Sequence, residues 1–197
     1  REFIPEAEKK EEYGKFVDII RGELNRVDRI VEEFLLSVKA HAPFLKENIN
    51  SLFEEIITVL KEKATSKGIT LVNNVDARVE LQVQKERLKQ SFYNIILNGI
   101  EAIDGNGTVE ISTEIKDKNL NIYIRDSGGG IKKSELDKIF EYYYTTKDKG
   151  MGIGLPISYV IIKDHGGDII VTSEEGKGAT FLVMLPVDRA EGSNRPQ

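Results

Sequence analysis

The run Lys149-Gly150-Met151-Gly152-Ile153-Gly154-Leu155-Pro156-Ile157 places three glycines at alternate positions directly before an apolar, helix-like stretch. Glycine lets a backbone approach a ligand closely and take positive φ without a steric cost. A helix that begins here would point free N–H groups and the positive end of its dipole at whatever lies in front of it, which favours phosphate. The run therefore predicts a phosphate-binding turn, but glycine-rich turns are common and the rest of the chain must supply supporting residues.

Two common nucleotide-binding motifs are absent from the sequence. No G-x-x-x-x-G-K-[S/T] motif occurs, so the chain is not a P-loop protein. Neither glycine cluster completes G-x-G-x-x-G, because position 155 is Leu and position 133 is Lys. A dinucleotide-binding fold and the glycine loop of a serine/threonine kinase are therefore disfavoured.

The composition is that of an acidic globular protein. The 197 residues fit one ordinary domain plus an extension, and a hydrophobic fraction of 40% can form a substantial core. Charged residues make up 31% and the formal net charge is -5, which argues against nucleic acid as the main partner. Because there is no cysteine, the sequence excludes disulfides, thiolate zinc sites and a cysteine nucleophile.

The sequence shows no apolar run of membrane-spanning length and no signal peptide. We therefore expect a cytoplasmic chain without a membrane segment, while the sequence leaves open whether the parent protein is membrane-anchored. The chain begins at Arg1 rather than Met, so we expect a fragment of a longer protein.

A long amphipathic helix is predicted over residues 6–40. Its apolar residues follow one another at alternating steps of four and three, which is an unbroken heptad seam. The seam consists of Tyr13, Val17, Ile20, Leu24, Val27, Val31, Phe34 and Val38. A single helix cannot bury this face, so it packs either on the following domain or, as we favour, in a dimeric four-helix bundle whose other arm lies upstream. Pro43 disfavours helix in the residue before it, which places a domain boundary after residue 42.

The remaining chain alternates between helix and strand patterns. Helices are predicted over 49–66, 85–103, 134–140 and 153–164, the first capped by Asn48 or Asn50. Strands are predicted over 69–74, 79–83, 109–115, 120–124, 168–172 and 179–185. This order indicates an α+β fold, a two-layer sandwich in which a mixed, largely antiparallel sheet carries helices on one face. Residues 43–187 form this domain, and the polar residues 188–197 are predicted to be a disordered tail.

Two asparagines interrupt the predicted helix over 85–103. Asn94 and Asn98 are four residues apart and therefore share a face of this helix, away from its apolar stripe. They could be buried amides satisfied by local hydrogen bonds. Alternatively, an Asn oxygen could coordinate Mg²⁺, which commonly takes one or two protein oxygens and completes its shell with water and phosphate. The helix alone does not decide between the two.

Asp126 stands at the end of a predicted strand, directly before Ser127-Gly128-Gly129-Gly130. Its carboxylate could cap a turn. It could equally accept a hydrogen bond from an exocyclic amine such as that of adenine, with the glycines letting the base lie against the backbone. Both interpretations stay open at this point.

Five motifs in a fixed order resemble the sequence boxes of one family. Residues 94–102 resemble an asparagine box, 126–130 the glycine box D-x-G-x-G, 139–147 a phenylalanine box, 150–155 a second glycine box, and 176–181 the closing G-x-G-x-x-F element. Together they resemble the catalytic part of a two-component sensor histidine kinase, within the larger ATPase group of gyrase B, Hsp90 and MutL. The resemblance implies a Bergerat-type ATP-binding fold over residues 43–187, preceded by the second helix of the dimerisation and phosphoacceptor domain in residues 1–42.

The resemblance implies a role for each matching residue. Asn94 and Asn98 would be the catalytic asparagines, with Asn98 holding Mg²⁺ between the ATP phosphates. Asn94 stands where related ATPases place a glutamate that activates water, and an amide cannot act as a base, which suits phosphate transfer to protein rather than ATP hydrolysis. Asp126 would bind the adenine amine, with Thr180 nearby through a water. The other ATP-binding residues would be Gly128, Gly130, Ile131, Thr146, Lys147, Gly150, Gly152, Gly154 and Leu155.

Residues 141–151 would form a lid that closes on ATP. Lys147 or Lys149 could reach a phosphate from this lid, or could be a solvated loop lysine. The sequence departs from the family pattern at residues 142–144, where tyrosines replace phenylalanines and a proline. It departs again at Gly99, where alanine is usual, and at Glu101, where some relatives carry a basic phosphate contact.

The implied cofactors are ATP and Mg²⁺. The implied partners are a second copy of the chain, through the N-terminal helix, and the receiver domain of a response regulator. The reaction would transfer the γ-phosphate of ATP to a protein histidine for relay to an aspartate of the regulator. Two other functions remain open, namely an anti-sigma-type serine kinase of the same ATPase group and a nucleotide-binding regulatory module without catalysis.

The acceptor histidine is not expected within this chain. His165 stands at a predicted helix end, where a histidine suits the helix dipole, and His41 stands at the domain junction. Neither lies in the H-E-[L/I]-R-x-P context of the family's acceptor. We therefore expect the acceptor upstream of Arg1.

We predict that this chain binds Mg·ATP but does not phosphorylate itself, because it lacks the acceptor. Incubation with γ-labelled ATP, followed by measurement of acid-labile phosphate, should give no substantial incorporation. Labelling at His41 would contradict this interpretation.

Overall fold

The computed structural model describes residues 20, 22, 27, 42–147 and 151–188. The chain separates into two compact units, Arg1–Ala42 and Pro43–Gln197, and the division coincides with the boundary placed at Pro43. In the first unit Ile20, Gly22 and Val27 are helical. Ile20 and Val27, two members of the heptad seam, are 57% and 53% exposed. The rest of the predicted seam, His41 and the tail from residue 189 lie outside the described residues.

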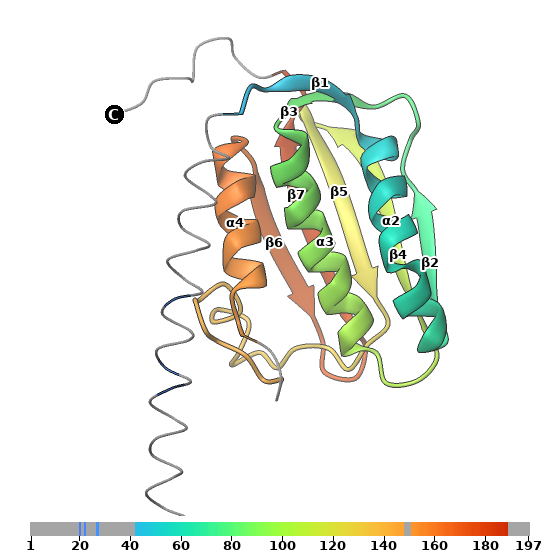
Figure 1. Ribbon diagram of the computed structural model, residues 1–197, viewed down its shortest axis with the longest axis vertical. Coiled ribbons are helices and arrows are strands. Elements are labelled where there is room, and N and C mark those ends of the chain that lie inside the picture. The colour runs from blue at the N-terminus through green and yellow to red at the C-terminus, as the bar shows by residue number, and fades with distance from the viewer. Residues whose placement is uncertain (1–19, 21, 23–26, 28–41, 148–150, 189–197) are drawn as a thin grey trace, which may run out of the picture. The chain divides into compact units, whose positions relative to one another are not determined.

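A five-stranded sheet forms the centre of the second unit (Figure 1). In spatial order its strands are β2 (Ile69–Asn74), β4 (Gly107–Lys116), β5 (Asn119–Asp126), β7 (Ala179–Pro186) and β6 (Asp168–Ser173). β2 and β4 are parallel, and the other neighbouring pairs are antiparallel. One face of the sheet is covered by the helices α2 (Ile49–Ser66), α3 (Lys85–Ala102) and α4 (Gly154–Asp164). The predicted α+β sandwich with a mixed, largely antiparallel sheet is confirmed.

The core lies between the sheet and the helices. α3 runs between α2 and α4 (Figure 1), and its apolar face is fully buried. This face consists of Leu88, Phe92, Ile95, Ile96 and Ile100. The rings of Phe53 on α2 and Phe92 on α3 lie 4.7 Å apart and join the two helices. Burial of one such side chain stabilises the fold by about 2 kcal/mol, so this face fixes the position of α3 on the sheet.

A second sheet has two antiparallel strands, β1 (Leu45–Asn48) and β3 (Glu80–Val83). β3 was predicted as a strand, but β1 was not, because its sequence Leu-Lys-Glu-Asn has no alternating apolar pattern. β1 forms because β3 supplies its hydrogen-bonding partner from more than thirty residues away in the sequence. Within residues 42–147 and 151–188, the other predicted strands and helices agree with the structure to within two residues at each end, apart from one helix.

The helix predicted over 134–140 does not form. The backbone N–H groups of Glu135, Lys138 and Glu141 each donate to the carbonyl three residues earlier, which gives a succession of turns. So short a stretch is not stable as an isolated helix. Tertiary contacts determine its path instead, because Ile139 is buried and the ring of Phe140 lies 5.5 Å from that of Tyr159 on α4.

A buried arginine ties the N-terminal end of α3 to the C-terminal end of α4. Arg87 is 3% exposed, and its Nη2 contacts the carboxylate of Asp164 while Nη1 donates to Gln84 Oε1 at 2.9 Å. A buried guanidinium needs such partners because an unpaired buried charge is strongly destabilising. Arg87 therefore fixes how far α4 extends along α3.

Two further contacts continue along the same face of α3. Ser158 Oγ donates to the carbonyl of Ser91 at 3.1 Å, and Asn94 Nδ2 donates to the carbonyl of Gly154 at 3.1 Å. Arg87, Ser91 and Asn94 are separated by steps of four and three, so they lie on one helix face, here called the polar stripe of α3. Because later residues of α3 meet earlier residues of α4, the helices are antiparallel and the C-terminal half of α3 lies beside the start of α4.

His165 ends α4 as predicted, but it acts as a neutral group. It is 3% exposed, and the N–H of Gln84 donates to its Nε2 at 3.1 Å. Nε2 therefore carries no proton, so Nδ1, 2.7 Å from the carbonyl of Ile161, carries it and donates. The predicted place of His165 at a helix end is confirmed, and its neutral ring satisfies a carbonyl of the last turn of α4. Its burial is also unsuited to a phosphoacceptor.

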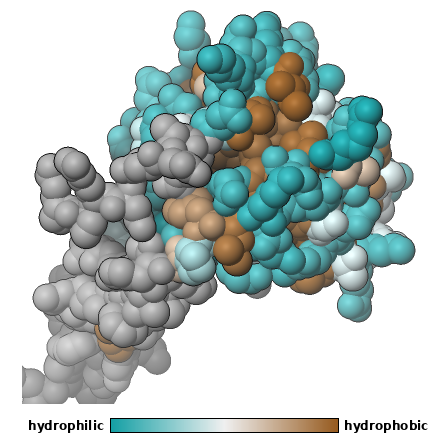
Figure 2. Space-filling model, turned by 90° about the horizontal axis from the view of Figure 1, so that it is seen from above, coloured by the Kyte–Doolittle hydropathy of each residue, from teal (hydrophilic) through white to brown (hydrophobic). Residues whose placement is uncertain are grey.

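Apolar side chains interrupt the hydrophilic surface at the end of the molecule that carries β1 (Figure 2). Leu45 of β1 is 55% exposed. This end of the fold is opposite the start of α4, so the polar groups described below lie at the other end of the helix layer (Figure 1).

The cap of α2 provides a test of the local structure. Asn48 Oδ1 accepts from the N–H of Ser51 at 2.9 Å, whereas Asn50 lies inside the helix and pairs with Glu54 and Asn73. We predict that Asn48→Ala lowers the free energy of unfolding by about 1 kcal/mol, because a first-turn N–H loses its acceptor. Urea unfolding measures the loss.

Asn50→Ala is the matched control and should cost less, because the contacts of Asn50 are with the side chains of Glu54 and Asn73 and alanine has the higher helix propensity. An equal or larger loss for Asn50→Ala would contradict the assignment of Asn48 as the cap.

Candidate functional site

A cavity of about 460 Å³ opens where the C-terminal half of α3 meets the start of α4. This volume is ordinary for a small-molecule site. The predicted residues that line it are Asn98, Asp126, Gly130, Ile131, Thr146, Lys147, Gly152, Gly154 and Leu155. Asn94, Gly128 and Thr180 are described by the structure but do not line the cavity, and Gly150 lies outside the described residues. Nine of the predicted residues are thus brought together around one space.

Asp126 supplies a buried carboxylate at this cavity. It is the last residue of β5 and is 4% exposed. Its Oδ1 accepts from the N–H groups of Gly128 at 2.8 Å and Ala179 at 3.3 Å. Burial raises the pKa of Asp126, and these hydrogen bonds offset the effect only in part. Among the described residues both bonds fall on Oδ1, so Oδ2 is the oxygen left to accept from a ligand.

Three glycines let the backbone fold tightly around Asp126. A Cβ on Gly128 would lie 2.5 Å from the carbonyl oxygen of Ala102, and a Cβ on Gly178 would lie 2.1 Å from that of Asp126. Gly130 and Gly178 also have positive φ, which glycine adopts without strain. Gly128 thus shapes the site indirectly, by allowing close backbone packing beside the carboxylate, whereas Gly130 lines the cavity itself and packs against the carbonyl of Glu174.

The start of α4 faces the cavity, as the opening glycine run predicted. Gly152, Gly154 and Leu155 line it, and the first turn has no side-chain cap. Pro156 lies in this turn, where its missing N–H leaves no helical bond unmade. The free N–H groups at 154 and 155 favour an anion in front of the helix. Gly152 has a second role, because its carbonyl accepts from the N–H of Tyr143 at 2.9 Å.

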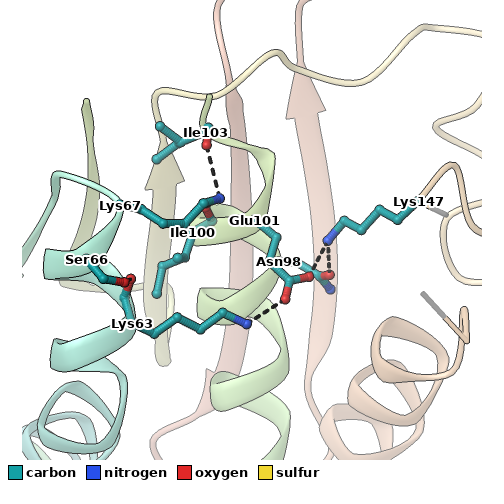
Figure 3. Close-up of polar contacts among 8 residues, drawn as sticks. All are labelled: Lys63, Ser66, Lys67, Asn98, Ile100, Glu101, Ile103 and Lys147. Atoms are coloured by element: carbon teal, nitrogen blue, oxygen red, sulfur yellow. Dashed lines mark hydrogen bonds and ion pairs between the residues drawn. The ribbon is translucent and has the colours of Figure 1, made fainter. Parts of the chain in front are cut away.

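Asn94 and Asn98 have different surroundings although they share a helix face. Asn94 uses its amide N–H₂ to hold Gly154, so it positions the start of α4 and fits the buried-amide interpretation. Asn98 points toward Lys147, whose Nζ lies 2.9 Å from Asn98 Oδ1 (Figure 3). The oxygen of Asn98 is therefore turned to a cation, as a metal ligand would be.

Glu101 is a site residue that the sequence analysis did not assign to binding. It lines the cavity, and its two oxygens contact Lys147 Nζ at 2.9 Å and Lys63 Nζ at 2.8 Å (Figure 3). Burial alone would raise the pKa of Glu101, but hydrogen bonds from Lys63 and Lys147 outweigh it and hold the pKa below its ordinary value. The spacing could have revealed this residue, because Asn98 and Glu101 continue the polar stripe of α3 by steps of four and three.

The structure does not bring Thr180 to the cavity. Its neighbours on β7, Ala179 and Phe181, line the cavity and are buried. Successive side chains of a strand point to opposite faces, so Thr180 points to the other face of the sheet. The predicted water-mediated contact of Thr180 is therefore wrong, and Ala179 stands beside Asp126 instead.

Apolar and aromatic residues that the sequence did not single out also line the cavity, including Ile139, Tyr144 and Phe181. Burial and the nearby carboxylate of Glu135 raise the pKa of the Tyr144 phenol. An apolar lining next to a single buried carboxylate suits a heterocyclic ring that carries a hydrogen-bond donor.

The oxygen atoms at the cavity also indicate which kind of metal could bind there. Among the residues that the structure describes, no three His, Asp or Glu side chains are grouped to hold a metal. The oxygens of Asn98 and Glu101 fit a cation such as Mg²⁺ that draws its other ligands from water and phosphate.

Comparison with known proteins identifies relatives of this chain. Residues 83–189 match the model of the histidine kinase-, DNA gyrase B-, and HSP90-like ATPase family. Sporulation kinase C of Bacillus subtilis is 37% identical over 175 residues, which cover 87% of this chain and 41% of that kinase. Sensor histidine kinase ZraS of Escherichia coli is 35% identical over 179 residues, covering 90% and 38%.

Solved structures agree with these matches. The catalytic domain of histidine kinase ThkA aligns with a TM-score of 0.68 at 30% identity and covers 74% of this chain and 97% of that domain. ThkA in complex with the response regulator protein TrrA aligns with a TM-score of 0.67 at 28% identity, covering 95% of this chain and 53% of ThkA.

The fold and the cavity together define an ATP-binding domain. The chain belongs to the histidine kinase-, DNA gyrase B-, and HSP90-like ATPase family, and within it to the sensor histidine kinases. It spans about two fifths of the length of the curated relatives it matches, 41% and 38%. No helix in the described part of the chain is long and apolar enough to cross a membrane.

The buried carboxylate yields a prediction about stability and pH. Because the folded-state pKa of Asp126 is raised, the folded protein is destabilised relative to the unfolded chain once the group ionises. We predict that Asp126→Asn, which keeps the Oδ1 acceptor, is at least as stable as the wild type at pH 7. The difference should shrink as the pH falls through the raised pKa toward the ordinary aspartate pKa of about 4. Urea unfolding at several pH values measures it.

Asp168→Asn is a control of opposite sign. The hydrogen bond from Lys163 lowers the pKa of Asp168, so its ionised form stabilises the fold above the ordinary pKa and this stability is lost on acidification. The asparagine should therefore destabilise at pH 7. A loss of stability in Asp126→Asn at pH 7, or a difference independent of pH, would contradict the account of Asp126.

Proposed function

We propose that this chain is the catalytic region of a sensor histidine kinase that transfers the γ-phosphate of ATP to a histidine in another part of the same protein. One observation carries the proposal. A single cavity contains the buried carboxylate of Asp126, the amide oxygen of Asn98 and the start of α4. These groups match, in turn, an adenine amine, a metal-bound phosphate and an anion.

Asp126 is proposed to read the base. Its Oδ2 accepts a hydrogen bond from the exocyclic amine of adenine, while Oδ1 continues to accept from the N–H groups of Gly128 and Ala179. A base that lacked this donor would leave a buried carboxylate oxygen unpaired, which costs about 1–3 kcal/mol. The apolar residues Ile131 and Phe181 line the same cavity and exclude water from the ring.

The phosphates are proposed to lie between α3 and α4. The N–H groups at the start of α4 bind and orient them, and Asn94 fixes that helix end through the carbonyl of Gly154. Asn98 offers its oxygen to Mg²⁺, which when bound neutralises charge on the transferring phosphate. Asn94 cannot remove a proton from water, so the site favours transfer to another acceptor over hydrolysis.

The partners are proposed from the relatives. ThkA is solved with the response regulator protein TrrA, and by this likeness the present kinase passes its phosphate to the aspartate of a receiver domain. The exposed seam residues Ile20 and Val27 support a helical partner for residues 1–42, which a second copy of the chain would supply.

Phosphate labelling of the full-length protein tests this function. With γ-labelled ATP and Mg²⁺, the wild type should acquire acid-labile, base-stable phosphate, and Asn98→Ala should lose at least about 90% of it, since the metal loses its protein ligand. Asn119→Ala, at the first residue of β5, is the matched control and should label normally.

Acid-stable label would indicate a serine-directed kinase instead. ATP binding without any label would indicate a regulatory module. Either result would overturn the proposed function.

A further inference from the structure

The ammonium of Lys147 occupies a cation position formed by α3. Its Nζ lies 2.9 Å from both Asn98 Oδ1 and Glu101 Oε2 (Figure 3). The two oxygens come from residues three apart on one helix face, so the helix itself sets their separation. One is an amide oxygen and the other a carboxylate oxygen, which are the ligand types that Mg²⁺ takes from proteins.

The same two oxygens cannot serve Lys147 and a metal together. A protein oxygen binds Mg²⁺ at about 2.0–2.1 Å, which places the metal inside the space that the ammonium now uses. An ammonium and a Mg²⁺ ion bound to the same two oxygens would also repel one another. This repulsion is only partly screened, because the side chains of Lys147 and Glu101 are 36% and 33% exposed. Occupation by Lys147 and by Mg²⁺ is therefore mutually exclusive.

Glu101 remains available when Lys147 leaves. Lys63 on α2 holds its other oxygen at 2.8 Å, independently of Lys147. This second contact keeps the carboxylate facing the cavity. Glu101 therefore places a negative charge at this position. By the family resemblance, some relatives carry a basic residue here that contacts phosphate.

We infer that Lys147 is a tethered cation that competes with Mg²⁺ for Asn98 and Glu101, and that Glu101 is a second protein oxygen of the metal site. This inference rests on the proposed function. In the free protein Lys147 donates to both oxygens and neutralises the carboxylate of Glu101. With Mg·nucleotide, Lys147 gives them up to the metal.

The competition predicts a specific pattern of nucleotide affinity. Calorimetry measures the dissociation constant of ADP in the presence of Mg²⁺ and in the presence of EDTA. The enhancement by Mg²⁺ is the EDTA value divided by the Mg²⁺ value. Lys147→Met removes the competitor, so the enhancement should rise about fivefold, the factor of one partly exposed ion pair. Glu101→Gln weakens the metal site, so the enhancement should fall. Lys147→Arg keeps a cation and should restore the wild-type ratio.

Lys163→Met is the matched control, because Lys163 also forms an ion pair, with Asp168, but does not line the cavity. Its enhancement should equal that of the wild type. An unchanged ratio in Lys147→Met would overturn the inference. Loss of a lysine that only contacts phosphate would lower both affinities equally, and loss of a solvated lysine would change neither.

The experiment distinguishes failure of the proposed function from failure of the inference about Lys147. A wild-type protein that binds no ADP in either condition would overturn the proposed function and this inference with it. A wild-type protein that binds Mg·ADP, with the same enhancement in Lys147→Met, would overturn the inference alone.

Discussion

The polar stripe of α3 is the constraint on which the fold and the site both depend. Its opposite face is fixed on the sheet by fully buried side chains, which sets the direction of every polar residue on the helix. Arg87, Ser91 and Asn94 hold α4 alongside, and the stripe then extends beyond the start of α4 as Asn98 and Glu101. The same spacing that joins two helices therefore also brings two oxygen ligands to the cavity.

Asp126 is the second feature on which the site depends, and its ionised carboxylate destabilises the fold. Burial disfavours its ionised form, and glycines are required around it because a side chain at Gly178 would collide with the backbone. A buried carboxylate with a raised pKa in a cavity is typical of a binding residue. The buried carboxylate and the stripe come from different elements, β5 and α3, and meet only in the folded domain.

Much of this arrangement could be predicted from the sequence. Period-two and period-3.6 patterns gave most element bounds, and motif order indicated the nucleotide site. The patterns did not predict structure that depends on contacts with residues distant in the sequence. β1 has no pattern of its own, 134–140 follows tertiary contacts, and neutral His165 depends on the N–H of Gln84. Strand alternation could have excluded Thr180, and continuation of the stripe could have revealed Glu101. The contact of Lys147 with Asn98 could not be predicted, because it joins a loop to a helix across 49 residues.

The central claim is that the cavity reads adenine through Asp126. The most direct measurement is calorimetric binding of ATP and of purine riboside triphosphate, which lacks only the exocyclic amine, each with Mg²⁺. The account predicts that ATP binds about tenfold or more tightly, because the analogue leaves the buried carboxylate oxygen unpaired, and that Asp126→Ala removes this difference. Equal affinity of the wild-type protein for the two nucleotides would contradict the account.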